Sequence, residues 1–249
     1  MSRTLVLDAG NSRTKWGLHA VRGWMSFGAI PNGEIGTLAL REWQNLPRPD
    51  RIVGVNVAGE AARMRIEAQL ARWRVPPRWL TATAAAAGVV NSYAQPAQLG
   101  ADRWAALVAA RKRALAMELF PPPVVVVNAG TAVTVDALDA EGVFRGGVIL
   151  PGLRLMLQAL AEHTAGLKSM PGSYRDFPTN TGDALYSGAV QAITGAIGEM
   201  RARLAGDANS VRCLLAGGAA QDIAPHLGGP LEVVDSLVLE GVLALADAG

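Results

Sequence analysis

The chain has 249 residues, half of them apolar and 18% charged, so it can bury one large core or two smaller ones. The 23 basic and 21 acidic residues leave a net charge of only +2, and the arginines are scattered, which excludes a basic field for nucleic acid. The apolar runs are too short or too broken to span a membrane. The totals favour a folded, soluble protein.

The single cysteine, Cys213, excludes an internal disulfide and fits a reducing compartment. It lies in "VRCLLAGG", where we interpret it as a buried strand thiol rather than a nucleophile, because no histidine is near it in sequence. The N-terminus enters a strand at once, without the basic and apolar pattern of a signal peptide. We therefore expect a cytoplasmic protein.

The first half begins with "LVLDAGNSRTKWGL" (5–18), which predicts a buried strand, a tight turn and a returning strand. A strand is predicted at 51–58 and a helix at 60–75. A loop then ends at Gly100 and a long helix begins at Asp102. The three prolines at 121–123 stop that helix, so we expect an N-terminal lobe over 1–120 and a C-terminal lobe over 121–249.

The second half begins in the same way, with "VVVVNAGTAVTV" (124–135) as strand, turn and strand. Residues 146–167 predict strand, turn and helix, and 180–204 a long helix. Strand, glycine turn and helix follow over 211–227, and a last helix over 235–246. Strands that alternate with helices, with a hairpin opening each half, indicate mixed α/β sheets.

The two opening turns form an internal repeat at an offset of 120 residues. Asp8, Ala9 and Gly10 align with Asn128, Ala129 and Gly130, while Asn11 meets Thr131 and Thr14 meets Thr134. The shared strand-turn-strand context favours duplication over a chance match. Two similar α/β halves that face each other across a cleft are the expected result.

Polar residues at the end of a buried strand need a partner, and a phosphate chain on each turn supplies one. Gly10 and Gly130 allow a close backbone approach, and Asn11, Ser12 and Thr131 add neutral donors. Asp8 is placed to hold Mg²⁺ on the phosphates, and Lys15 adds a compensating positive charge. The alternative is two ordinary hairpins, but two such turns plus the glycine pair of "LLAGGAA" (214–220) favour a nucleoside triphosphate site.

A third candidate element is "LGADRWAAL", at the start of the long helix. Asp102 is suited to accept a hydroxyl proton and Arg103 to hold an anionic group, with Tyr93 as an aromatic wall on the same loop. The alternative is a helix cap beside a surface cation. The three histidines lie far apart and match no metal spacing.

Five motifs in order resemble type III pantothenate kinase, including relatives called Bvg accessory factor: "DAGNSRTKWG", "NSYAQPAQLGADRWAAL", "NAGTAVTVD", "GGVILPGLRLMLQAL" and "NTGDALYSG". The resemblance spans residues 5 to about 245. It implies the acetate kinase, sugar kinase, Hsp70 and actin superfamily, with two duplicated ribonuclease H-like (actin-like ATPase) domains whose mixed sheets are flanked by helices. The implied reaction is ATP-dependent phosphorylation of pantothenate, the first step towards coenzyme A.

The resemblance also implies roles for individual residues. Asp102 would be the catalytic proton acceptor, Asp8 would serve Mg²⁺, and Arg103 would bind the pantothenate carboxylate. The ATP-binding set would be Asp8, Ala9, Gly10, Asn11, Ser12, Arg13, Thr14, Lys15 and Thr131, and the substrate-binding set Tyr93, Gly100, Ala101, Asp102, Arg103 and Thr181. Family members are homodimers, and Thr181 would act near the dimer interface.

The resemblance implies the usual dependence of the family on K⁺ or NH₄⁺, which is associated with an aspartate that is common where this chain has Asn128. Asparagine keeps an oxygen ligand but removes the charge, so the resemblance leaves cation dependence open here. Two rival functions remain at this point: a kinase of another small alcohol, and a nucleotide-binding regulator without catalysis. The absence of large insertions disfavours a bulky substrate, and the retention of Asp8 and Asp102 disfavours a pure regulator.

Overall fold

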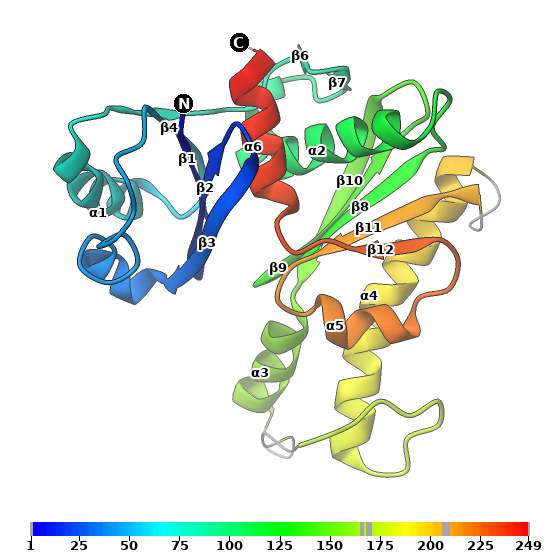
Figure 1. The fold of residues 1–249 in the computed structure, drawn as a ribbon. Helices are drawn as coiled ribbons and strands as arrows, with labels where there is room; N and C mark the ends of the chain where they lie inside the picture. Colours follow the sequence, from blue (N-terminus) through cyan, green and yellow to red (C-terminus); the bar gives the residue numbers. More distant parts are fainter. Residues whose placement is uncertain (1, 165–166, 168–170, 206–209, 249) are drawn as a thin grey trace. The chain divides into compact units, whose positions relative to one another are not determined.

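The computed structural model describes residues 2–164, 167, 171–205 and 210–248. The chain forms two compact units (Figure 1). The first unit comprises residues 1–113 and 236–249, and the second comprises residues 114–235. Within the described residues, no helix combines the length and apolarity that a bilayer crossing requires.

The first unit is built on a sheet with the strand order β3-β2-β1-β4-β5. Its strands are β1 (Thr4–Ala9), β2 (Arg13–Ala20), β3 (Gly23–Pro31), β4 (Arg51–Asn56) and β5 (Pro77–Trp79). The first three strands pair antiparallel, while β4 pairs parallel with both β1 and β5. A short hairpin, β6 (Ala85–Ala86) and β7 (Val89–Asn91), follows.

The second unit repeats this arrangement. Its strands run in the order β10-β9-β8-β11-β12, again with three antiparallel strands followed by two parallel ones. They are β8 (Val124–Ala129), β9 (Ala132–Leu138), β10 (Val143–Pro151), β11 (Arg212–Ala216) and β12 (Leu231–Val233). The matching order and directions confirm the predicted duplication and the mixed α/β fold class.

The strand registers correct one detail of the predicted repeat. Asp8 lies opposite Lys15, whereas Asn128 lies opposite Thr134. Three residues (10–12) join the first pair of strands and two (130–131) join the second. The proposed match of Thr14 with Thr134 was therefore wrong. The offset is 120 before the turn and 119 after it, because the second turn is one residue shorter.

Helices cover the sheets of both units. The first unit contains the 3₁₀ segments η1 (Asn32–Thr37), η2 (Ala71–Trp73) and η3 (Pro96–Gln98), and the helices α1 (Glu60–Leu70) and α6 (Leu237–Ala248). It also holds most of α2 (Ala101–Met117), which runs across the unit boundary. The second unit contains α3 (Leu153–His163), α4 (Thr181–Ala205), α5 (Ala220–Ile223) and η5 (Ala224–His226).

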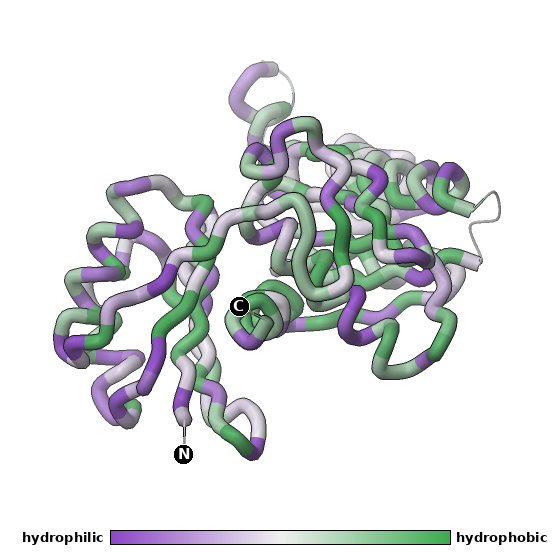
Figure 2. The backbone as a smooth tube through the Cα atoms, turned by 90° about the horizontal axis from the view of Figure 1, so that it is seen from above, coloured by the Kyte–Doolittle hydropathy of each residue, from purple (hydrophilic) through white to green (hydrophobic). Residues whose placement is uncertain are grey.

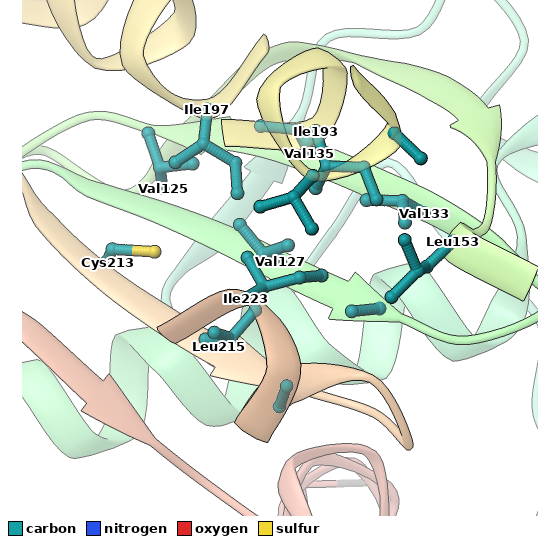
Figure 3. Close-up of a cluster of buried hydrophobic side chains, with 14 of the residues drawn as sticks. Val125, Val127, Val133, Val135, Leu153, Ile193, Ile197, Cys213, Leu215 and Ile223 are labelled. Atoms are coloured by element: carbon teal, nitrogen blue, oxygen red, sulfur yellow. The ribbon is translucent and has the colours of Figure 1, made fainter. Parts of the chain in front are cut away.

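The core of the second unit explains the run of four valines at 124–127. All four are buried, as expected for a strand that is covered on both faces. On one face, Val125 and Val127 pack with Ile193 and Ile197 of α4 (Figure 3). Cys213 lies in the same cluster, and burial raises the pKa of its thiol to about 11. The prediction of a buried strand thiol is confirmed.

The grouping of residues into units differs from the expected lobes at the C-terminus. The largely apolar helix α6 (Figure 2) packs on β1 and β4 of the first unit. Gly241 of α6 lies so close to the Ala105 carbonyl of α2 that no Cβ fits, and Glu240 pairs with Arg113 at 2.8 Å. The apolar face of the last helix is therefore buried against the first unit, which sequence order alone does not reveal.

Candidate functional site

The first turn places a buried carboxyl group at the end of β1. Asp8 is 7% exposed, and its register partner on β2 is Lys15. Burial raises the pKa of Asp8 to about 7, with Lys15 opposing the rise and Asp102 adding to it. A buried carboxylate whose burial is not offset by the neighbouring lysine is suited to hold a cation.

The loop of this turn, residues 10–12, lies at the surface. The Gly10 N–H donates to the Arg13 carbonyl at 3.1 Å, while Asn11 and Ser12 are exposed. Neither Gly10 nor Gly130 is among the described glycines with positive φ, so the turn shape itself does not demand glycine at these positions. At Gly10 a Cβ would lie only 3.2 Å from the Arg13 carbonyl oxygen, so glycine avoids a tight contact inside the turn.

Two residues of the predicted ATP-binding stretch point into the protein. Ala9 is fully buried in the core of the first unit, and Thr14 is fully buried and donates to Asn32 Oδ1 at 3.0 Å. Arg13 is exposed, and its guanidinium donates to the Ala29 carbonyl at 3.3 Å. The buried side chains of Ala9 and Thr14 therefore stabilise the turn from the interior of the first unit.

The start of α2 places Asp102 and Arg103 together. The Arg103 main-chain N–H donates to Asp102 Oδ1 at 2.8 Å. Burial raises the pKa of Asp102, against the effect of these main-chain bonds and of Arg103. Gly100 leaves room for this carboxylate, since a Cβ there would lie 2.7 Å from Asp102 Oδ1.

Arg103 connects the helix to the preceding loop. Its side chain is 6% exposed and donates from Nη1 to the Tyr93 hydroxyl at 3.2 Å. The guanidinium carbon lies 6.0 Å from the centre of the Tyr93 ring, within cation–π range. The structure thus brings Tyr93, Asp102 and Arg103 together at the start of α2.

Asp8 and Asp102 belong to the same unit and influence each other electrostatically, since the charge of Asp102 raises the pKa of Asp8. Two carboxyl groups 94 positions apart in the chain therefore share one region of the first unit. The described residues include no cluster of three or more His, Cys, Asp or Glu side chains that could hold a metal ion alone. A cation beside Asp8 would need oxygen ligands in addition to this carboxylate.

The second turn, at the end of β8, is enclosed by two glycines. Gly152 donates its N–H to the Thr131 carbonyl at 2.9 Å, and it has no room for a Cβ beside the Gly130 carbonyl. Gly217, in the "LLAGGAA" motif, has a φ of +104° and lies directly against the Ala129 backbone. Gly217 therefore packs the motif against the end of β8, while Gly218 has open space around its Cα.

Thr181 begins α4 and is exposed, beside an apolar groove between α3 and α4. The groove has a volume of about 780 Å³ and includes Pro151, Leu155, Met156, Leu160 and Leu185 among its lining residues. Asn180 caps α4 by accepting the Asp183 N–H at 2.9 Å. The structure places Thr181, Thr131 and Asn128 in the second unit and the other predicted site residues in the first.

Sequence interpretation missed two asparagines that hold these loops. Asn32 follows β3 and bonds to the first turn, and Asn91 ends β7 and bonds to the loop that carries Tyr93. The only local signal at Asn32 is the turn dipeptide Asn-Gly. Asn91 is the first residue of the motif "NSYAQPAQLGADRWAAL", but an asparagine at this position indicates no particular chemistry.

Comparison with known proteins decides the family. Residues 4–203 match the family model described as type III pantothenate kinase. This chain belongs to the type III pantothenate kinase family. The resemblance read from the five motifs is thereby confirmed.

Curated type III pantothenate kinases align along nearly the whole chain. The protein of Nitrosospira multiformis is 47% identical over 243 residues, which cover 97% of this chain and 90% of that protein. The protein of Methylibium petroleiphilum is also 47% identical, over 248 residues that cover 97% of each chain. The match therefore includes both duplicated units.

Solved structures agree on the fold of this chain. A conserved Baf family protein from Campylobacter jejuni has a TM-score of 0.64 at 20% identity, covering 98% of this chain and 97% of that one. The psk41 ParM protein has a TM-score of 0.52 at 10% identity, covering 99% and 97%. A glucokinase from an Antarctic psychrotroph has a TM-score of 0.50 at 12% identity, covering 99% of each chain. These likenesses confirm the predicted actin-like, sugar-kinase-like fold.

Proposed function

We propose that this chain transfers the γ-phosphoryl group of ATP to the primary hydroxyl of pantothenate, giving 4′-phosphopantothenate for coenzyme A biosynthesis. Membership of the type III pantothenate kinase family supports the reaction. The observation that carries the mechanism is the common location of Asp8 and Asp102, one at a phosphate-type turn and one at the acceptor helix. Phosphoryl transfer depends on this kind of positioning and charge neutralisation more than on covalent chemistry.

For the nucleotide, we assign residues 8–15 and Thr131 to the triphosphate. The exposed loop supplies main-chain N–H groups and the Asn11 and Ser12 side chains, while Lys15 offsets phosphate charge. Asp8 fits Mg²⁺, because its buried carboxylate needs positive charge and oxygen is the ligand this ion prefers. When bound, Mg²⁺ would neutralise charge on the transferring phosphoryl group.

For the acceptor, we assign Gly100, Ala101, Asp102 and Arg103 together with Tyr93 and Thr181. Arg103 is held at 3.2 Å by the Tyr93 hydroxyl, so its planar guanidinium is oriented before a carboxylate arrives. Asp102 lies one residue away, at the first turn of α2. This spacing lets one helix end bind the pantothenate carboxylate and align the hydroxyl.

In the chemical step, the pantothenate hydroxyl oxygen forms a bond to the γ-phosphorus while the bond from that phosphorus to the β–γ bridging oxygen breaks. Asp102 accepts the hydroxyl proton, and ADP leaves with the bridging oxygen. The raised pKa of Asp102 makes it a stronger base than an exposed aspartate. Lys15 stabilises the negative charge on the phosphates.

Monovalent cation dependence is a separate proposal. Asn128 is the second-last residue of β8, close to the second turn, and offers a neutral amide oxygen. A neutral ligand attracts K⁺ or NH₄⁺ less strongly than a carboxylate does. We therefore expect weaker stimulation by K⁺ or NH₄⁺ than an aspartate at this position would give.

We also propose a cytoplasmic homodimer. The apolar groove beside Thr181 supports the dimer, because Leu155 and Leu160 are each about two-fifths exposed there (43% and 41%). The single buried thiol supports a reducing compartment.

The proposed reaction is tested by ADP formation from purified protein with ATP and Mg²⁺. We expect ADP release that requires pantothenate, with one phosphopantothenate formed for each ADP. Release with another small alcohol but not with pantothenate would support the rival kinase. ATP binding without ADP release under any of these conditions would support the non-catalytic regulator.

A further inference from the structure

Three successive carbonyl groups of the first turn bond to a single residue, Asn32. The Asn32 side-chain Nδ2 donates to the Gly10 carbonyl at 2.8 Å and to the Asn11 carbonyl at 2.9 Å. The Asn32 main-chain N–H donates to the Ser12 carbonyl at 3.0 Å. The turn contributes all the acceptors in this set, and Asn32 contributes all the donors.

Asn32 is itself held from two sides. The buried Thr14 hydroxyl donates to Asn32 Oδ1 at 3.0 Å, which fixes the orientation of the amide. Arg65 of α1 donates to the main-chain carbonyls of Asn32 and Gly33, both at 3.1 Å. The clamp on the turn is therefore anchored in the strand β2 and the helix α1.

The consequence follows from peptide geometry. A trans peptide is planar, so its N–H points opposite to its C=O. With the Gly10 and Asn11 carbonyls turned towards Asn32, the N–H groups in the same peptides point the other way. Rotation of either peptide would present a partially negative carbonyl oxygen to a phosphate instead of an N–H. The hydrogen bonds from Asn32 oppose that rotation.

A second asparagine, Asn91, holds the loop that carries Tyr93 in the same way. Asn91 is 7% exposed, and its Nδ2 donates to the Thr83 and Pro96 carbonyls, both at 3.2 Å. Its Oδ1 accepts the Tyr93 main-chain N–H at 3.1 Å. Tyr93 in turn receives the hydrogen bond from Arg103. The position of Tyr93 thus depends on Asn91.

We infer that Asn32 is a positioning residue for the triphosphate turn and that Asn91 is its counterpart for the pantothenate loop. Both roles rest on the proposed assignment of these two loops to ATP and pantothenate. Neither asparagine needs to touch a substrate. Each acts by fixing the backbone of one binding loop.

The test uses a matched pair of variants, Asn32→Asp and Asn91→Asp. Each change keeps the size and one acceptor oxygen, removes the two side-chain donations to carbonyls and adds a negative charge. Asn32→Leu and Asn91→Leu remove the same donations without adding a charge, so they are measured beside the aspartate variants and should shift the same KM values. We expect Asn32→Asp to raise the KM for ATP roughly tenfold and to change the KM for pantothenate less than about twofold. Asn91→Asp should do the reverse. The kcat at saturation of both substrates should stay within about threefold for each variant.

If Asn32 served only the overall stability of the fold, Asn32→Asp would change the KM for ATP and the KM for pantothenate by similar factors. Equal rises in both KM values for Asn32→Asp, or no rise in the KM for ATP, would overturn the inference. If Asn32→Asp does not fold, Thr14→Val removes the hydroxyl that orients the amide, and it should raise the KM for ATP by a smaller factor, about threefold. A KM for ATP unchanged in Thr14→Val would then overturn the inference.

Lys15→Met separates this inference from the proposed ATP site. A raised KM for ATP in Lys15→Met with an unchanged value in Asn32→Asp would reject the positioning role alone. An unchanged KM for ATP in Lys15→Met would reject the triphosphate assignment, and the role of Asn32 with it.

Discussion

At the scale of single residues, Asp8 combines a proposed role at the nucleotide with a cost in stability. Its folded pKa is about 7 against an ordinary value of 3.8, so the folded state favours the protonated form. The ionised form is therefore destabilising above pH 7, and that penalty disappears as the pH falls towards 4. A neutral side chain of the same shape avoids it.

We predict that Asp8→Asn raises the free energy of unfolding of the nucleotide-free and Mg²⁺-free protein by roughly 2 kcal/mol at pH 8. The gain should shrink as the pH is lowered to 5, where the native Asp8 carries a proton. ADP formation should fall by at least about a hundredfold, because the phosphates lose their Mg²⁺ ligand. Urea unfolding at the two pH values measures the first effect. A destabilised variant at pH 8 would contradict this account of Asp8.

Asn128 is the second residue at which the effect of a charge can be tested. Replacing it with aspartate adds a carboxylate beside the second turn, at the end of β8. We predict that Asn128→Asp lowers the K⁺ concentration for half-maximal stimulation roughly tenfold, as the added Coulomb attraction requires. Titration of ADP formation with KCl, at constant ionic strength set by a large organic cation, measures it. Identical K⁺ dependence in both proteins would remove Asn128 from the cation proposal.

At the scale of elements, α6 depends on a glycine. A Cβ on Gly241 would clash with the Ala105 backbone of α2, and a backbone atom cannot move aside cheaply. Gly241→Ala should therefore lower the free energy of unfolding by roughly 2 kcal/mol. The control is Gly198→Ala in α4, where a Cβ meets no atom within 4 Å and alanine should gain up to about 1 kcal/mol from helix propensity. If the urea midpoint moved in the same direction in both variants, the result would argue against close packing of α2 and α6.

Periodicity in the sequence predicted the longer elements well. The strands at 51–58 and 124–128 and the helix at 180–204 correspond to β4, β8 and α4 within a few residues. The short segments η1, β5 and β12 were missed, because pieces of three to six residues show no complete period. The one-residue difference between the two turns was missed for a related reason, since strand pairing and not sequence spacing sets the register.

The candidate site was predictable only in part. Asp8, Asp102 and Arg103 stand out because charged residues follow a buried strand or begin a helix in a recognisable motif. Asn32 lies 20 to 22 positions from the carbonyls to which it donates, and asparagine beside glycine indicates only a turn. Support of this kind depends on tertiary contacts, which a single sequence does not encode in any local pattern.

At the scale of the whole molecule, the grouping of α6 with the first unit could not be predicted from the order of elements. Two sequence repeats suggested a cut into consecutive halves. The apolar face of α6 is instead buried on β1 and β4, and hydrophobic burial is indifferent to position along the chain.

The oligomeric state is also a property of the whole molecule. Leu160 lines the apolar groove and is 41% exposed. We predict that the native chain sediments as a dimer and that Leu160→Glu shifts it to a monomer, because burial of a charge in an apolar interface is unfavourable. Sedimentation velocity at several concentrations measures this, with the exposed Leu40→Glu as control. A monomeric native chain at all concentrations would contradict the homodimer proposal.

The central claim is that Asp102 accepts the pantothenate proton beside a triphosphate held at Asp8. Its most direct test is the kcat of Asp102→Asn, a change that keeps the shape of the side chain and removes the base. We predict a fall of roughly a hundredfold or more with a KM for ATP that stays within about threefold of the native value. Turnover within about threefold of the native enzyme would contradict the claim.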